Sequence, residues 1–357
     1  MDPKDLTQNR RVAEIRSLDS PRQLRQRLPL TADLAGVVVA GREAVISILD
    51  GQDDRLLVVV GPCSIHDPEA GLEYARRLVR LAGRHRDELH IVMRAYFEKP
   101  RTTVGWKGLT NDPGLDGSFR VGDGLSVARA FLLDVLSLGL PVGCEFLDPI
   151  TPQYLADTVS WGAIGARTTQ SQIHRQLASG LSMPVGFKNS TEGDVQVAVD
   201  AIASAGTAQV FPGIDDRGRA AVVATEGNPD CHLVLRGSTS GPNYDEAHVA
   251  DALGQLERSG MVRRLVVDAS HGNSRKDHRL QPSVAVDISQ RVAAGERGIV
   301  GVMLESFLIA GRQDLGDSPL VFGQSITDAC MGWEATVDVL GHMAAAVVHR
   351  RESLSAA

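Results

Sequence analysis

The sequence predicts an α/β fold, a (β/α)8 TIM barrel with an N-terminal helical extension and an inserted β-hairpin. Three observations support this: eight apolar runs of strand length, helical segments between them, and a charged or metal-binding residue at the end of each run. Parallel strands end on one face of such a barrel, where its active sites lie, so these side chains are expected to converge. The runs and their end residues are Leu56–Val60 with Cys63, His90–Met93 with Arg94, Pro141–Cys144 with Glu145, Gly162–Ala166 with Arg167, Pro184–Phe187 with Lys188, Cys231–Leu235 with Arg236, Leu265–Ser270 with His271, and Ile299–Leu304 with Glu305.

Helical segments alternate with these runs in the order that produces a parallel sheet. They include Pro68–Ala82, Val121–Leu138, Thr151–Ser160 and Gly193–Ala205. Two segments interrupt the alternation: a long polar, glycine-rich loop at residues 97–124 and an expected β-hairpin at residues 207–227, where QVF and AAVVAT flank PGIDDRG. Long insertions of this kind are usually functional.

The first 50 or so residues differ from the rest. Arg11–Arg27 is charged and helix-prone, and Leu34–Leu49 places apolar residues at helical spacing. An extension this short cannot build a substantial core alone, so it is expected to dock on its own barrel or on a neighbouring subunit. We therefore predict an extension of residues 1–52 with oligomer or regulatory contacts, and a catalytic barrel of residues 53–357 that carries the hairpin 207–227.

Composition argues against several classes of protein. The chain has 357 residues, 43% of them hydrophobic, and a net charge of −7, which gives no general basic surface for nucleic acid or an anionic membrane. No apolar run approaches the roughly 20 residues of a membrane span, and the start lacks the apolar segment of a signal peptide. The four cysteines show no CxxC spacing and read as reduced thiols. We expect a cytoplasmic protein.

Four residues from distant parts of the chain could hold a metal ion: Cys63, His271, Glu305 and Asp328. A thiolate, an imidazole and two carboxylates suit a divalent transition metal or zinc rather than magnesium or calcium alone. Each residue by itself is explained as well by an ordinary role in the core or on the surface. Their shared placement near strand ends, with Asp328 in the loop after the last strand, favours a site for Mn, Fe, Co or Zn.

A second group of residues is cationic. Arginine makes bidentate hydrogen bonds to phosphate and carboxylate, and lysine acts as a movable point charge. A salt bridge to a neighbour such as Glu145 would explain any single arginine, but not the whole set on one barrel face. The set indicates a small polyanionic substrate, and it comprises Arg94, Lys99, Arg101, Arg167, Lys188 and Arg236, with the alcohol of Thr102 nearby.

Longer motifs surround these residues: GPCSIHDP (61–68), MRAYFEKPRTTVGWKGL (93–109), GCEFLDPITPQY (143–154), WGAIGARTTQSQIHRQLASGLS (161–182), PVGFKNST (184–191), DASHGNS (268–274), GVMLES (301–306) and SITDACMGWE (325–334). Together they closely resemble the microbial class I 3-deoxy-D-arabino-heptulosonate 7-phosphate synthases. The resemblance covers nearly the whole chain.

The resemblance implies a transferase (EC 2.5.1.54) that condenses phosphoenolpyruvate with erythrose 4-phosphate, the first step of the shikimate pathway toward chorismate and aromatic amino acids. It places Cys63, His271, Glu305 and Asp328 at the metal. It places Arg94, Arg167, Lys188 and Arg236 at phosphoenolpyruvate, and Lys99, Arg101 and Thr102 at erythrose 4-phosphate. Of these, Lys99, Lys188 and His271 are candidate catalytic residues, together with Glu145, which could orient or deprotonate the water that adds at C2.

The resemblance also implies a feedback site for an aromatic amino acid, whose identity the sequence leaves open, and a homodimer or homotetramer. The implied site residues are Asp148, Pro152, Leu177, Leu181, Ser182, Phe211 and Val223. The hairpin sequence VFPGIDDRGRAAVVATEGNPD and the turn GSTSGPNY depart from the pattern of regulated relatives, and Phe307 stands where some relatives carry histidine.

Four alternatives stay open at this stage. A 3-deoxy-octulosonate 8-phosphate synthase would share the barrel, but KPRTT resembles the binders of four-carbon aldose phosphates. A paralogue in secondary metabolism could take imino-erythrose 4-phosphate or another aldose phosphate. A metal-independent Schiff-base aldolase would use Lys188 as its nucleophile. A regulatory paralogue would bind the ligands without turnover, against which the complete set of site residues argues.

Overall fold

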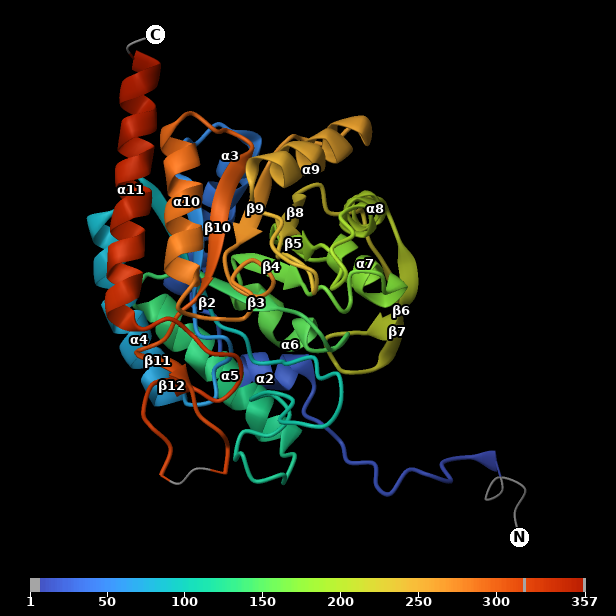
Figure 1. Ribbon diagram of the computed structural model, residues 1–357. Helices are drawn as coiled ribbons and strands as arrows, with labels where there is room; N and C mark the ends of the chain where they lie inside the picture. Colours follow the sequence, from blue (N-terminus) through green and yellow to red (C-terminus); the bar gives the residue numbers. More distant parts are fainter. Residues whose placement is uncertain (1–6, 317–318, 356–357) are drawn as a thin grey trace.

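The computed structural model describes residues 7–316 and 319–355, with the side chains of 354 and 355 excepted, and its centre is a closed barrel of eight parallel strands (Figure 1). The neighbouring order is β1-β10-β9-β8-β5-β4-β3-β2. The strands are β1 (Leu56–Gly61), β2 (Leu89–Arg94), β3 (Val142–Glu145), β4 (Trp161–Ile164), β5 (Val185–Lys188), β8 (Cys231–Leu235), β9 (Leu265–Asp268) and β10 (Ile299–Glu305). Every predicted run overlaps one of them, which confirms the predicted fold.

The strands read as continuous apolar runs because both of their faces are buried, one in the barrel interior and one beneath the helices. All six residues of β1 and all seven of β10 are buried. The surrounding helices are α4 (Pro68–Arg84), α5 (Val121–Ser137), α6 (Pro152–Leu155) with the 3-10 turn η1 (Ala156–Thr158), α7 (Gln172–Ser179), α8 (Gln196–Ala205), α9 (Glu246–Arg258), α10 (Gln281–Ala293) and α11 (Trp333–Ser355). All four helices predicted between the runs are present, although the third is short.

Helix α3 (Ala32–Asp50) closes the amino end of the barrel. Its Val45, Ile48 and Leu49 are buried in one cluster with barrel side chains that include Trp161. The Leu49 carbonyl accepts a hydrogen bond of 2.7 Å from Arg264 Nη1, just before β9. Full burial of one such aliphatic side chain contributes about 1.5–3 kcal/mol. Helix α3 is therefore part of the barrel core of its own chain.

Helix α2 (Pro21–Arg27) begins later than the sequence suggested. The helix-prone segment Arg11–Arg27 is helical only in its last part, and residues 13–20 have no regular structure. The start is fixed by a capping box, in which the Ser20 hydroxyl accepts from Gln23 N and the Gln23 side chain accepts from Ser20 N at 2.8 Å. Proline fits the first helical position but not a helix interior, so Pro21 excludes a helix that runs through it from Arg11.

The segment around α2 lies on an antiparallel hairpin of β6 (Val210–Ile214) and β7 (Ala220–Ala224), which confirms the predicted inserted hairpin. Arg22 Nε donates to Asp216 Oδ2 at 2.8 Å in the hairpin turn, and Arg22 N donates to the Asp216 carbonyl at 2.8 Å. On the other side, the Tyr154 hydroxyl of α6 donates to the Asp19 carbonyl at 2.8 Å. Residues 19–28 therefore bridge the hairpin and α6 of the same chain.

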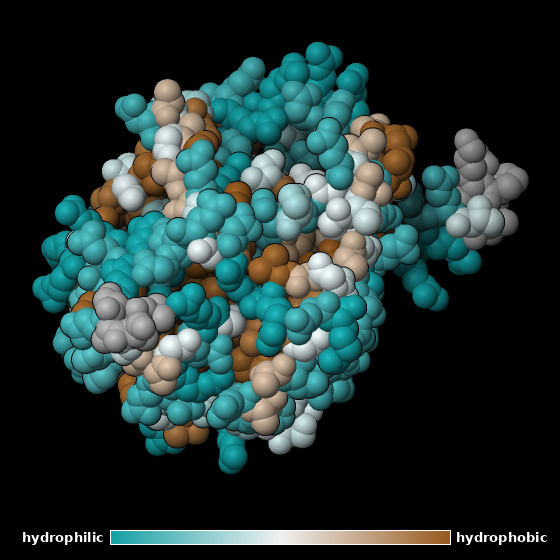
Figure 2. Space-filling view, turned by 90° about the horizontal axis from the view of Figure 1, so that it is seen from above, coloured by the Kyte–Doolittle hydropathy of each residue, from teal (hydrophilic) through white to brown (hydrophobic). Residues whose placement is uncertain are grey.

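Two short strands, β11 (Ile309–Arg312) and β12 (Gln324–Ser325), pair after β10 and lead into the loop that carries Asp328. Within the described ranges, no helix is long and apolar enough to cross a bilayer. Hydrophilic residues cover most of the face seen in Figure 2, and hydrophobic residues appear there in separate patches.

Candidate active site

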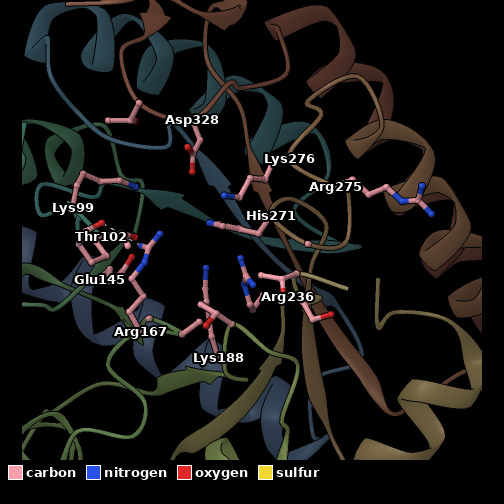
Figure 3. A pocket seen from close by; sticks show the side chains of 18 of the residues that line it. Lys99, Thr102, Glu145, Arg167, Lys188, Arg236, His271, Arg275, Lys276 and Asp328 are labelled. Carbon is pink, nitrogen blue, oxygen red and sulfur yellow. Dashed lines mark hydrogen bonds between the residues drawn. The ribbon is translucent and has the colours of Figure 1, made fainter. Parts of the chain in front are cut away.

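A cavity of about 940 Å³ opens at the carboxyl ends of the barrel strands. Figure 3 shows the charged ends of Lys99, Arg167, Lys188 and Arg236 directed toward its centre. Besides these four, the predicted site residues Arg101, Thr102, Glu145, His271 and Asp328 line the cavity. Strand ends far apart in the sequence therefore meet on one face, as the strand pattern predicts.

The cations differ in how firmly the protein holds them. Lys188 and Arg236 are buried, and burial lowers the pKa of Arg236 although Asp268 acts against this shift. Arg167 and Arg101 are exposed, and each donates to one backbone carbonyl, that of Pro100 at 3.2 Å and that of Trp106 at 2.8 Å respectively. These four residues give the cavity two buried and two exposed cationic groups for anionic oxygens, a combination suited to small phosphates.

Arg94 lies elsewhere than the sequence suggested, beneath the cavity and outside its lining. Its Nε donates to the Pro62 carbonyl at 3.0 Å, and its Nη2 donates to Glu305 Oε1 at 2.9 Å and to the Cys63 carbonyl at 3.3 Å. Its guanidinium also stacks 3.7 Å from the centre of the Tyr96 ring. In this arrangement Arg94 holds the strand ends that carry two predicted metal ligands, and a contact with substrate stays a prediction.

Three of the four predicted metal ligands come together, with donor atoms of Cys63, Glu305 and Asp328 all within 4.8 Å of one another. His271 falls outside that group, although its Nε2 lies 3.7 Å from Glu305 Oε1. Burial, followed by the charge of Glu305, raises the pKa of the Cys63 thiol. Arg94 contacts Glu305 Oε1 and Lys99 contacts Cys63 Sγ, so cations already lie against this set. The donor types, a thiol, two carboxylates and a nearby imidazole, fit a transition metal or zinc.

The chain segment 305–331 explains how these ligands meet. The Glu305 carbonyl accepts from Met331 N at 3.0 Å, and the Met331 carbonyl accepts from Phe307 N at 2.9 Å, so the Asp328 loop is held beside the end of β10. The Phe307 ring packs edge-on against His66, with centroids 6.2 Å apart, and lies at the same distance from Tyr74. Phe307 therefore has a packing role beneath the ligand loop.

Glu145 lines the cavity beside Gly165, which directly follows β4 and has no side chain. A Cβ atom on Gly165 would lie 2.1 Å from Glu145 Oε1. No real contact is that short, so only glycine leaves room for the carboxylate in this position. Glu145 is thus held within the cavity, where it can accept a proton or orient water.

Comparison with known proteins identifies the chain. The DAHP synthetase I family matches residues 28–341. The chain belongs to this family. It is 54% identical over 342 residues to "Phospho-2-dehydro-3-deoxyheptonate aldolase, Phe-sensitive" of Escherichia coli (strain K12), covering 96% of this chain and 97% of the relative. It is 52% identical over 353 residues to "Phospho-2-dehydro-3-deoxyheptonate aldolase" of Corynebacterium glutamicum, covering 97% and 96%.

The solved structures agree. The "Structure of Phospho-2-dehydro-3-deoxyheptonate aldolase from Francisella tularensis SCHU S4" matches with a TM-score of 0.93 and 48% identity, over 95% of this chain and 99% of that chain. Other relatives of similar identity are named Trp-sensitive and Tyr-sensitive. As a DAHP synthetase I protein, the chain is a transferase of aromatic amino acid biosynthesis, and its reaction is the first step of the shikimate pathway.

Asp268 is a residue of this DAHP synthetase I site to which sequence reasoning gave no role. It ends β9, is fully buried, and contacts Lys188 Nζ at 2.8 Å and His271 Nδ1 at 2.9 Å. Burial raises the pKa of this carboxyl, but Lys188 and His271 outweigh that effect and hold it well below its usual value. A signal was present in the sequence, because an acidic residue that ends the buried run LVVD needs a cationic partner.

The segment 271–276 holds further residues that the sequence did not reveal. His271, Arg275 and Lys276 all have positive φ, at 53°, 53° and 60°, and such strained backbone is concentrated at functional sites. Lys276 and Arg275 both line the cavity, and Lys276 points into it while Arg275 points away (Figure 3). The turn around His271 also needs Gly272, whose Cβ would lie 2.4 Å from Ser238 N.

The seven residues of the expected effector site lie on α6, α7 and the hairpin or in the loops beside them. Phe211 and Val223 are partners across the hairpin, and both are half-buried. Glu98 connects this region to the cavity, because its carboxylate accepts from Leu147 N at 3.1 Å and from the Thr151 hydroxyl at 3.0 Å. Burial raises the pKa of Glu98 to about 7. The remaining members are Asp148 and Ser182, which are exposed, and Pro152, Leu177 and Leu181, which are buried.

Proposed function

We propose that this chain condenses phosphoenolpyruvate with D-erythrose 4-phosphate and water to give 3-deoxy-D-arabino-heptulosonate 7-phosphate and phosphate. The observation that carries the proposal is the meeting of the cationic residues and a metal-binding triad at one end of the barrel. Both substrates carry a negatively charged phosphate group. The reaction also needs the aldehyde group of erythrose 4-phosphate to be activated. Membership in the DAHP synthetase I family supports the same reaction.

The cavity residues divide into two groups by role. Lys188 and Arg236, which are buried, and Arg167 at the rim bind the phosphate and carboxylate of phosphoenolpyruvate. Arg101 and Thr102 hold the phosphate of the aldose. Held in this way, C3 of phosphoenolpyruvate faces the aldehyde carbon, and a bimolecular encounter becomes an oriented reaction.

Two further residues move protons. Lys99 protonates the new alkoxide, and its Nζ already lies 3.1 Å from Cys63 Sγ, next to the candidate metal ligands. Glu145 orients or deprotonates the water that adds at C2, after which phosphate leaves. Cys63, Glu305 and Asp328 would hold the metal, with His271 as the fourth ligand, and a divalent ion bound there would polarise the aldehyde carbonyl. Mn, Fe, Co and Zn all suit this donor set.

The alternatives fit less well. A Schiff-base aldolase needs a lysine amine that is free to attack a carbonyl, whereas Lys188 Nζ is already paired with the buried carboxylate of Asp268 at 2.8 Å. That mechanism also leaves the thiol and carboxylates of the triad without a task. The imino-erythrose 4-phosphate alternative shares the site and differs only in the aldose.

The test is to follow phosphoenolpyruvate consumption with erythrose 4-phosphate and with other aldose phosphates, including the imino form. We expect the highest kcat/KM with erythrose 4-phosphate. A clear preference for another aldose phosphate would assign the chain to that substrate. Covalent trapping of Lys188 by borohydride in the presence of substrate would instead support the Schiff-base mechanism.

An aromatic amino acid is the proposed effector, and the bridge of residues 19–28 between α6 and the hairpin is where it would act. Coupling between separate sites is typically about 1–3 kcal/mol. Inhibition by phenylalanine, tyrosine and tryptophan should be measured in the intact chain and in one that begins at Asp19, which keeps α3 in place. Equal inhibition of both forms would show that residues 1–18 have no regulatory role, and a homodimer or homotetramer is the expected assembly of the intact form.

A deeper truncation would mislead, because removal of all residues before Asp50 would also remove α3 from the barrel core. A matched variant is Arg22→Ala, which removes the side-chain bonds of Arg22 to Asp216 Oδ2, keeps the backbone bond between the same residues and leaves the cavity intact. We expect this variant to shift the inhibitor concentration for half-inhibition and to leave kcat unchanged. An unchanged inhibition curve would remove the Arg22–Asp216 ion pair from the regulatory mechanism.

A further inference from the structure

One carboxylate oxygen in the cavity floor serves two functional side chains. Asp268 Oδ2 lies 2.8 Å from Lys188 Nζ and 2.9 Å from His271 Nδ1. The other oxygen, Oδ1, accepts from Ser270 N at 3.0 Å and from the Ser270 hydroxyl at 2.5 Å. Asp268 has no exposed surface, so these partners are the groups that compensate its buried charge.

We propose that Asp268 is a positioning residue that couples the binding of the metal to the binding of phosphoenolpyruvate. This inference rests on the proposed function, which gives His271 to the metal and Lys188 to phosphoenolpyruvate. Asp268 itself touches neither ligand. It acts through the two side chains that share its Oδ2.

His271 Nδ1 lies 2.9 Å from Asp268 Oδ2 and 2.7 Å from Ser270 Oγ, whose own hydroxyl donates to Asp268 Oδ1. Both neighbours of Nδ1 act as acceptors, so Nδ1 carries the hydrogen and the lone pair of His271 is on Nε2. That atom faces the ligand group, 3.7 Å from Glu305 Oε1. A carboxylate behind a metal-binding histidine fixes its tautomer and raises its basicity, and loss of such a partner typically costs roughly 10- to 100-fold in metal affinity.

The contact between Lys188 and Asp268 determines that the coupling is positive. A metal on Nε2 makes the Nδ1–H a stronger donor, which draws the charge of Asp268 toward His271 and frees Lys188 to bind an anion. Conversely, an anion on Lys188 leaves more of the Asp268 charge for His271 and strengthens its bond to the metal. Each ligand therefore tightens the other, and thermodynamic linkage requires the two factors to be equal.

The experiment measures binding rather than turnover. Mn²⁺ affinity is determined by competition with a fluorescent chelator, with and without phosphoenolpyruvate, in the wild type and in Asp268→Asn. In the wild type we expect phosphoenolpyruvate to tighten Mn²⁺ binding by roughly 5-fold or more, within the usual range of coupling. In Asp268→Asn we expect Mn²⁺ affinity to fall roughly 10- to 100-fold. We also expect the ratio of Mn²⁺ affinities with and without phosphoenolpyruvate to approach one.

The matched control is Asp157→Asn, which removes a carboxylate from the ion pair with Arg129, away from the cavity. It should leave both affinities and their coupling as in the wild type. Wild-type coupling in Asp268→Asn would overturn the inference, since contact between phosphoenolpyruvate and the metal would then explain it. If the wild type binds neither Mn²⁺ nor phosphoenolpyruvate, the proposed function itself fails.

A second variant keeps the inference falsifiable if Asp268→Asn does not fold. Lys188→Met removes the competitor for Asp268 Oδ2 and keeps much of the side-chain length. We expect it to bind Mn²⁺ several-fold more tightly than the wild type in the absence of phosphoenolpyruvate. A purely structural role for Asp268 predicts weaker or unchanged Mn²⁺ binding, and that result would reject the coupling.

Discussion

The two ends of the barrel differ in the side chains they carry: mostly charged at the carboxyl end and mostly apolar at the amino end. At the carboxyl end, seven lysines and arginines and two carboxylates among the described residues line a cavity, and three residues of segment 271–276 have strained backbone. At the amino end, α3 covers the interior with Val45, Ile48 and Leu49, and the buried His232 has a pKa lowered to about 4 by desolvation. The comparison indicates that one end carries the chemistry and the other supplies the stability that the charged end lacks.

The largest expected effect tests the carboxyl end. Removal of divalent metal by a chelator should reduce turnover to background, because Cys63, Glu305 and Asp328 form a site suited to a cation. Adding back Mn, Fe, Co or Zn should restore it. Elemental analysis of the chelated protein is the necessary control, and full activity in verified metal-free protein would contradict the prediction.

The next effect tests the amino end. Ile48→Ala should lower the free energy of unfolding by about 2–5 kcal/mol, because it leaves a cavity where α3 meets the barrel. Val39, on the exposed side of the same helix at 49% exposure, gives the matched control, and Val39→Ala should cost less than about 0.5 kcal/mol. Denaturant unfolding measures both. A large loss of kcat in folded Ile48→Ala would contradict the assignment of stability to the amino end and of catalysis to the carboxyl end.

A third test uses pH at the amino end. The ring of His232 accepts from Trp161 Nε1 at 3.1 Å, and burial lowers its pKa to about 4. This pKa lies below the unfolded value of about 6.5, so buried neutral His232 contributes fully to the free energy of unfolding above pH 6.5. That contribution is lost as pH falls toward 4, by about 1.4 kcal/mol per pH unit. His90 shifts in the same direction, so the wild type should be compared with His232→Gln at pH 7.5 and 5. Equal pH slopes in the two proteins would contradict this role.

The smallest effect sharpens the picture of the cavity. Arg101→Ala should raise KM for erythrose 4-phosphate about 10- to 100-fold, the effect of losing a charged hydrogen bond, and should change KM for phosphoenolpyruvate far less. Lys107→Ala is the matched control, since Lys107 is exposed in the same loop but does not line the cavity. Equal changes in both KM values would move Arg101 to the phosphoenolpyruvate side.

Sequence reasoning found the features that are local in the chain. A buried strand in a closed barrel needs an unbroken apolar run, and its last residue reaches the cavity, so the positions of Lys188 and Arg236 followed from the strands alone. The clustering of Cys63 with Glu305 and Asp328 followed for the same reason, once all strands were taken to end on one face.

Features that depend on pairs of distant residues could not be predicted in this way. No residue close to Arg94 in the sequence indicates that its guanidinium pairs with Glu305. Likewise, no residue close to Asp268 in the sequence identifies Lys188 as its partner. The closure of the barrel by α3 likewise depends on where Trp161 lies. The late start of α2 is different, because Pro21 was visible and its restriction on the helix could have been applied.

The position of α3 has a consequence for how the chain folds. This helix leaves the ribosome before any barrel strand, yet the donor that fixes its last turn, Arg264, belongs to the approach to β9. The elements that α3 contacts most are β1, β2, α5, η1 and β4, so its apolar face stays partly uncovered until nearly half of the polypeptide has been synthesised, and the bond from Arg264 forms later still. Contacts of such long sequence separation slow folding and prolong the time in which chains can aggregate. Refolding from denaturant should accordingly be slow, and chaperone assistance should increase its yield most when it protects the N-terminal helix.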